Sequence, residues 1–146
     1  MKKLLIALIG LMVLAGCASV PKGDAQQDLA LKQFKAPAEK AGLYVYRNEN
    51  FGAAIKMNVL LDNKQLGDTA AKTYLYTEVA PGKHQLVSKS ETDSVLDFDA
   101  VAGKIYYVWQ EIKMGTWSAG SKLQMMGEAE GKKGVSESSL AVTVQQ

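Results

Sequence analysis

Four acidic residues are the chain's best candidates for metal or acid–base chemistry: Glu91, Asp93, Asp97 and Asp99. In an extended strand, Asp97 and Asp99 would lie on one face about 6–7 Å apart, a spacing that permits a shared Ca²⁺ or a carboxylate pair. The competing interpretation is a solvated outer face, with Leu96 and Phe98 turned inward. We favour the outer face, because the glycine-containing loop pattern of Ca²⁺ sites is missing.

The chain's one histidine, His84, and one cysteine, Cys17, leave little for a site built on imidazole and thiolate. His84 follows a Pro-Gly turn, so we expect it to form structural hydrogen bonds there. The nucleophile-elbow pattern Gly-x-Ser-x-Gly is absent, and the stretch from Thr116 to Gly120 lacks its first glycine. We therefore expect a protein that is not an enzyme, with no catalytic residue, no metal and no cofactor.

Tyrosine and tryptophan residues form the other chemically distinctive set: Tyr44, Tyr46, Tyr74, Tyr76, Tyr106, Tyr107, Trp109 and Trp117. An exposed row of such rings stacks on sugars or clamps a partner, whereas aromatic residues in strands commonly pack across neighbouring strands. We favour cross-strand packing for most of them. Trp117, in the loop between Gly115 and Gly120, is the strongest candidate for a ligand or partner contact, followed by Tyr76 and Tyr74.

The amino terminus has the three-part layout of a secretory signal. Lys2 and Lys3 precede an apolar run over residues 4–14, and small residues lead to Cys17. The run is too short for a stable membrane span, which needs about 20 apolar residues. The signal is therefore expected to be removed.

The end of this segment, Leu14, Ala15, Gly16 and Cys17, resembles the lipobox of bacterial lipoproteins. The resemblance implies cleavage before Cys17 and acylation of both its thiol and its new amino terminus. Two or more acyl chains anchor a protein stably in a lipid bilayer, whereas one does so only marginally. Ala18, rather than Asp, follows the cysteine, so the resemblance favours the outer membrane with the domain facing the periplasm; inner membrane and cell surface stay open. The alternative is a non-lipidated signal with an incidental Cys17.

The net charge of the chain does not indicate a class of binding partner. The 17 basic residues less Lys2 and Lys3 leave 15, against 15 acidic residues, in a chain that starts at Cys17. The formal charge of +2 thus belongs to the signal. We expect no nucleic-acid binding.

Four segments follow from the residue pattern. Residues 1–16 are the signal, 17–41 the lipidated cysteine with a flexible tether, 42–133 a β-domain and 134–146 a polar tail that adds a strand or frays. Within the tether, a short helix capped by Asp24 is expected near residues 24–35, and its docking on the domain would shorten the free tether. Period-two alternation, as in Ile55–Asp62 and Thr73–Val79, predicts about seven short strands. The expected fold class is all-β, a small antiparallel β-sandwich of immunoglobulin-like or prealbumin-like type.

An ordered series of four segments resembles the DUF2846 family of bacterial lipoproteins: KAGLYVYR at 40–47, LLDNKQLG at 60–67, VAPGKH at 79–84 and AGKIYYV at 102–108. The resemblance covers roughly residues 32–133. It implies fold and location but no catalytic residue, because the family has no established activity.

Three functional hypotheses remain. The leading one is a non-catalytic envelope lipoprotein, held to the lipid bilayer through acylated Cys17, that presents a binding or structural surface to an unidentified envelope protein. The alternative is a glycan- or peptidoglycan-binding module using exposed Tyr and Trp side chains. A hydrolase using the acidic strand residues is the least favoured.

Overall fold

The structure, a computed structural model, describes residues 18–144. The predicted signal and its cleavage motif, Leu14, Ala15, Gly16 and Cys17, lie outside the described residues. Within the described part, no helix is long and apolar enough to cross a membrane.

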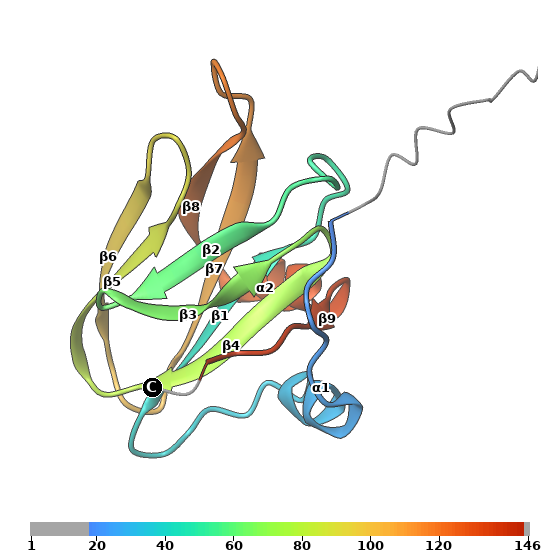
Figure 1. Cartoon of the computed structure of the whole chain (residues 1–146). Helices are drawn as coiled ribbons and strands as arrows, with labels where there is room; N and C mark the ends of the chain where they lie inside the picture. The colour runs from blue at the N-terminus through green and yellow to red at the C-terminus, as the bar shows by residue number, and fades with distance from the viewer. Residues whose placement is uncertain (1–17, 145–146) are drawn as a thin grey trace, which may run out of the picture.

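Two β-sheets pack face to face (Figure 1). The five-stranded sheet has the order β8 (Gly120–Met126), β7 (Ile105–Lys113), β1 (Ala41–Arg47), β4 (Thr73–Val79) and β9 (Ser139–Leu140). The four-stranded sheet has the order β3 (Lys64–Thr69), β2 (Met57–Leu61), β5 (Gly82–Ser88) and β6 (Ser94–Ala100). The predicted all-β sandwich is confirmed.

The sheets are not purely antiparallel, which corrects that part of the prediction. β1 pairs in parallel with β7, and β4 pairs in parallel with β9. Because the chain crosses to the four-stranded sheet after β1 and returns, and does so again after β4, β1 and β7 become neighbours without a hairpin between them, and such a pair is free to run in parallel. Period-two patterns show which face of a strand is apolar, but not which strand becomes its neighbour.

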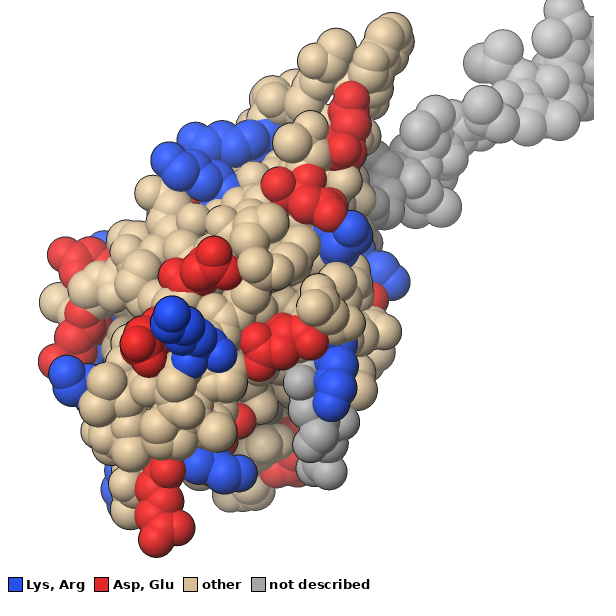
Figure 2. Space-filling model, turned by 90° about the vertical axis from the view of Figure 1, so that its left-hand side faces the viewer, with Lys and Arg blue, Asp and Glu red and all other residues tan. Residues whose placement is uncertain are grey.

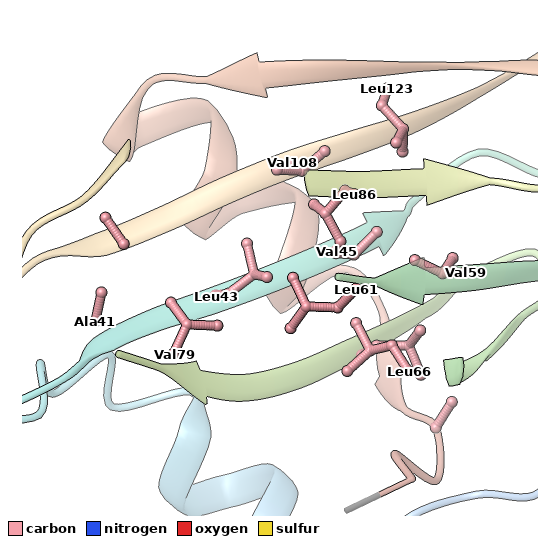
Figure 3. Close-up of a cluster of buried hydrophobic side chains, with 13 residues drawn as sticks. Ala41, Leu43, Val45, Val59, Leu61, Leu66, Val79, Leu86, Val108 and Leu123 are labelled. Atoms are coloured by element: carbon pink, nitrogen blue, oxygen red, sulfur yellow. The ribbon is translucent and has the colours of Figure 1, made fainter. Parts of the chain in front are cut away.

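An aliphatic core fills the space between the sheets (Figure 3). Leu43 and Val45 of β1 point toward Val59 and Leu61 of β2, and all four are at most 3% exposed. The alternation of β2 produces this directly, because its intervening residues, Asn58 and Leu60, are only half-buried.

The outer face of the five-stranded sheet carries a second core, the tyrosine layer: Tyr44, Tyr46, Tyr74 and Tyr107, with Val135 and Leu140. Helices α1 (Ala25–Leu31) and α2 (Glu128–Ser136) lie close to this sheet (Figure 1). Leu31 and Phe34 from the α1 segment and Val135 from α2 pack on the tyrosines. Both faces of the sheet are therefore covered, which explains why all seven residues of β1 are buried.

The α1 segment is docked, so the expected flexible tether over residues 17–41 is corrected for its described part. Asp24 caps α1 as predicted, accepting a hydrogen bond from the Gln27 amide at 2.9 Å. The Tyr74 hydroxyl donates to Asp28 at 2.6 Å, and the Tyr44 hydroxyl donates to the Leu31 carbonyl at 2.7 Å. Buried phenols need such partners, and this segment supplies them.

The carboxyl-terminal segment adds a strand to the domain, one of the two alternatives predicted for residues 134–146, and the predicted boundary at residue 134 falls inside α2. α2 continues to Ser136, β9 extends the sheet, and Thr143 bridges to Gly67. α2 approaches the sheet closely, since a Cβ at Gly134 would lie 2.0 Å from the Tyr46 ring. Glycine makes this contact possible at the cost of helix propensity.

Candidate functional site

Three loops gather at one end of the sandwich, at the top of Figure 1: residues 48–56, 89–93 and 114–119. We call this the loop end. A hollow of about 350 Å³ is lined by residues of all three loops, among them Ile55, Ser90 and Ser118. The described chain also begins at this end, in blue.

The first described residues are fixed to the domain. The Ala18 amide donates to the Ala53 carbonyl at 2.9 Å, and the Val142 amide donates to the Pro21 carbonyl at 3.0 Å. Gly23 donates to the Leu140 carbonyl at 2.8 Å. Almost no slack therefore separates residue 18 from the folded domain.

A buried arginine organises the first loop. The Arg47 guanidinium donates to the carbonyls of Ile55 at 2.8 Å, Gly52 at 3.2 Å and Thr69 at 3.3 Å. Burial lowers the pKa of Arg47, and the neighbouring Glu49 partly offsets this. Glu49 itself accepts from the Trp109 indole at 2.9 Å and from the Ile112 amide at 3.2 Å. The turn that holds Ala18 is thus tied to the core.

A carboxylate organises the third loop. The Glu91 Oε2 atom accepts from the Trp117 amide at 3.3 Å, the Ser118 amide at 3.1 Å and the Ser118 hydroxyl at 3.3 Å. A Cβ at Gly115 would lie 1.8 Å from the Ser118 carbonyl oxygen, so the turn requires glycine there. The backbone is therefore held while the Trp117 side chain is left 90% exposed. Glu91, a candidate acid–base group, serves here as a structural acceptor.

The structure separates the three aromatic contact candidates. Trp117 is exposed, as a contact residue must be. Tyr74 is fully buried beneath α1, so its prediction as a surface contact is wrong; the physical reason is the docked segment that bonds its hydroxyl. Tyr76 is half-buried, with its ring centroid 4.7 Å from that of Tyr44. These residues form no continuous exposed row.

His84 lies at the opposite end, beside an open cavity of about 550 Å³. Its Nδ1 is 2.6 Å from an Asp62 carboxylate oxygen and its Nε2 is 2.6 Å from the Ala80 carbonyl. Both partners only accept, so both ring nitrogens donate when the imidazole is charged. Asp62 reaches this position from a turn in which it and Asn63 have φ of 50° and 66°, values that Asp and Asn tolerate.

Charge pairing shifts both groups in the direction that stabilises the pair. Burial would lower the pKa of His84, but hydrogen bonds to Asp62 and Ala80 outweigh it and raise the pKa above its ordinary value. Burial would raise the pKa of Asp62, but hydrogen bonds from His84 and the Gln85 amide outweigh it and lower the pKa. Neither nitrogen is free to act as a base while these bonds last.

The acidic strand has an exposed outer face, as favoured from the sequence. Asp97 and Asp99 are exposed, while Leu96 and Phe98 are half-buried on the inner side. Asp97 accepts from the Gln85 amide group at 2.9 Å, and Asp93 pairs with Lys89. Among residues 18–144, no group of three or more His, Cys, Asp or Glu side chains is placed to hold a metal ion.

Fold and site together describe the class of protein: a small β-sandwich whose larger sheet is covered on its outer face by α1 and α2, with exposed apolar side chains at the loop end. Residues 37–122 match the family described as "Protein of unknown function (DUF2846)". A Haemophilus influenzae protein described as "Uncharacterized protein" is 33% identical over 140 residues, which cover 94% of this chain and 83% of the relative. The chain therefore belongs to the DUF2846 family. No solved structure matches it at a significant level.

Residues that the sequence did not single out shape the loop end: Arg47, Glu49, Phe51 and Met114. Arg47 carried a usable signal, because a charged residue that ends an alternating apolar strand must find buried acceptors if the strand is central. Phe51 and Met114 carried none, since single apolar residues in loops are common.

Proposed function

We propose that this protein is a bacterial envelope lipoprotein, anchored in the membrane through acylated Cys17, with a non-catalytic binding or structural domain. One observation carries the proposal. The sequence Leu14, Ala15, Gly16 and Cys17 ends an apolar leader, and the residue after this cysteine, Ala18, is bonded to the domain through its amide and the Ala53 carbonyl. Cleavage before Cys17 would therefore leave an acylated residue next in the chain to one that is fixed to the domain.

Two features support a non-catalytic role. Both nitrogens of the chain's one imidazole are engaged by Asp62 and Ala80. The candidate acids Glu91 and Asp93 accept hydrogen bonds from loop backbone, and Asp97 is solvent-exposed and accepts a hydrogen bond from the Gln85 side chain. A hydrolase based on these groups would need a base with an unoccupied nitrogen or oxygen and preorganised hydrogen-bond donors for the developing negative charge.

The first experiment tests the anchor. Mass spectrometry of the membrane fraction is expected to find a mature protein that begins at acylated Cys17. Cys17→Ser is expected to accumulate as uncleaved precursor. Ala18→Asp is the matched control, because it keeps the cysteine: acylation should persist, while the lipoprotein resemblance predicts a shift to the inner membrane. A soluble product cut elsewhere, without acyl groups, would overturn the proposal.

The second experiment tests the binding role. Crosslinking in living cells is expected to capture an envelope protein, and failure to capture any would remove most of its support. The alternative, glycan or peptidoglycan binding, is favoured by the exposure of Trp117 alone, because Tyr74 is buried and Tyr76 is half-buried. Unchanged binding to cell-wall sacculi after Trp117→Ala would exclude that alternative.

A further inference from the structure

The loop end displays large apolar side chains in water. Trp117 is 90% exposed and Met114 82%, the two highest values among the exposed large apolar residues of the described chain, and Phe51 on the neighbouring loop is 54% exposed. Loop 114–119 forms the highest point of the molecule in Figure 1. In Figure 2 the end of the uppermost protrusion carries no basic or acidic side chain. Single exposed apolar residues are ordinary, but a cluster on adjoining loops indicates a contact surface.

This surface adjoins the point at which Cys17 must attach. The Ala18 amide is bonded to Ala53, in the same turn as Phe51, and consecutive Cα atoms lie only about 3.8 Å apart. Loop 114–119 lies next to loop 48–56, because residues of both line the hollow at the loop end. A lipid attached to Cys17 would therefore bring the loop end close to the bilayer.

Charges at the loop end are paired or engaged. The lysines that flank the loops each have a carboxylate partner: Lys56 with Asp68 at 3.4 Å, Lys113 with Glu111 at 2.7 Å, and Lys89 with Asp93. Glu49 and Glu91 hold backbone and indole groups. No excess of positive charge is left to attract anionic lipid, so contact with a membrane would depend on the apolar side chains.

We propose that Trp117 and Met114, with Phe51 beside them, insert into the boundary between headgroups and acyl chains of the bilayer that holds Cys17. Tryptophan favours this depth because its ring is apolar and its indole N–H is polar. The anchor already holds the domain at the bilayer and so raises the effective concentration of the loop end there. A small apolar surface is then sufficient for contact. The inference rests on the proposed lipid anchor and sets the domain's orientation: the His84 end points away from the membrane.

Tryptophan fluorescence tests the contact, because the chain has only two tryptophans. The full chain, extracted from producing cells, is incorporated into phosphatidylcholine vesicles with or without a lipid carrying a nitroxide near the headgroup. Trp109→Phe leaves Trp117 as the reporter, and we expect the nitroxide lipid to reduce its emission about twofold. Trp117→Phe is the matched control; it leaves Trp109, half-buried with its indole bonded to Glu49, whose emission should not change.

Two further measurements separate the possible failures. Flotation with mass spectrometry reports whether Cys17 is acylated; an unacylated preparation is coupled through the Cys17 thiol to a maleimide lipid, and the quenching is repeated. Equal Trp117 emission with and without nitroxide lipid, in an anchored sample, overturns the inference and leaves Trp117 free for a glycan or protein. Quenching that requires added phosphatidylglycerol would also overturn it, because the paired charges predict no dependence on anionic lipid.

Discussion

The tyrosine layer and the loop end both contain several aromatic side chains, but these side chains are buried in the first region and exposed in the second. In the tyrosine layer, the rings of Tyr44 and Tyr107 stack with centroids 5.4 Å apart beneath chain segments from both ends of the sequence. At the loop end, polar groups hold the backbone and Trp117 is left in solvent. Ring type does not decide the outcome; the availability of a covering segment does.

The two regions also use carboxylates differently. Asp28 of α1 accepts from the Tyr74 hydroxyl and from Lys32, so it fastens a side chain that is already buried. Glu91 accepts from two loop amides and so shapes a turn whose side chain stays outside. The first arrangement stabilises the fold, whereas the second maintains a surface. Mutations in the two regions should therefore differ in what they change.

Truncating one ring in each region should give the largest difference. Tyr44→Ala removes a ring that is 1% exposed and contacts three other tyrosines, so we expect a loss of about 3–5 kcal/mol in the free energy of unfolding. Trp117→Ala, the matched control, should stay within about 0.5 kcal/mol of the parent, because its ring has little to lose. Urea unfolding followed by circular dichroism measures both. Equal losses would contradict the contrast between the regions.

The same glycine-to-alanine change should also have opposite consequences. A Cβ at Gly134 would meet the Tyr46 ring at 2.0 Å, so Gly134→Ala should destabilise by about 1–3 kcal/mol despite alanine's better helix propensity. Gly120, at the start of β8 below the loop tip, has no atom within 4 Å of its would-be Cβ, and Gly120→Ala should be close to neutral. If Gly134→Ala stabilised the protein, α2 would not be packed against the tyrosine layer as described.

Much of the fold could be predicted from the sequence, because each strand carries its own alternation of apolar and polar residues. The period-two alternation of β2 predicted that Val59 and Leu61 face inward, and Asp24 predicted the start of α1. The covered outer face was not predictable in the same way. α2 contains two glycines and little apolar surface, so its helix depends on the sheet beneath it, a tertiary effect that local propensity does not report.

The candidate site also contains residues that local sequence could predict and residues whose burial depends on distant segments. Trp117 was predictable, because a tryptophan in a glycine-flanked loop has few ways to be buried. Tyr74 and Tyr76 lie two positions apart on one strand, so nothing in the sequence indicated different burial for them. The difference comes from α1, whose Asp28, 46 residues from Tyr74, accepts the hydrogen bond of the Tyr74 hydroxyl. Cys17 remains a prediction, to be tested by mass spectrometry.

Removing a single hydroxyl should distinguish these two tyrosines. Tyr74→Phe loses a 2.6 Å hydrogen bond to a carboxylate in a buried setting, and we expect a cost of about 1–2 kcal/mol. Burial and Asp28 together hold the pKa of Tyr74 well above its ordinary value, so the phenol remains a donor at any neutral pH. Tyr76→Phe is the control, because its hydroxyl reaches only Glu78 at 3.5 Å on the surface, and its effect should not exceed about 0.5 kcal/mol. Thermal unfolding compares the pair.

The smallest effect should appear as a change in acid sensitivity. Burial would raise the pKa of Asp28, but hydrogen bonds from Tyr74 and Lys32 outweigh it, so the pKa is lowered in the folded protein. A lowered carboxyl pKa adds stability above the unfolded value of about 3.9 and loses it as pH falls through the folded value. Asp28→Asn should therefore be less stable than the parent at neutral pH, and the difference should shrink as pH falls below the unfolded value. Asp24→Asn is the control, since asparagine caps helices as well as aspartate does, and its difference from the parent at neutral pH should be small. Urea unfolding between pH 7 and pH 2.5 gives the comparison. A constant gap between Asp28→Asn and the parent would mean that Asp28 fastens α1 to the tyrosine layer by packing alone, without the charge that sets this region apart from the loop end.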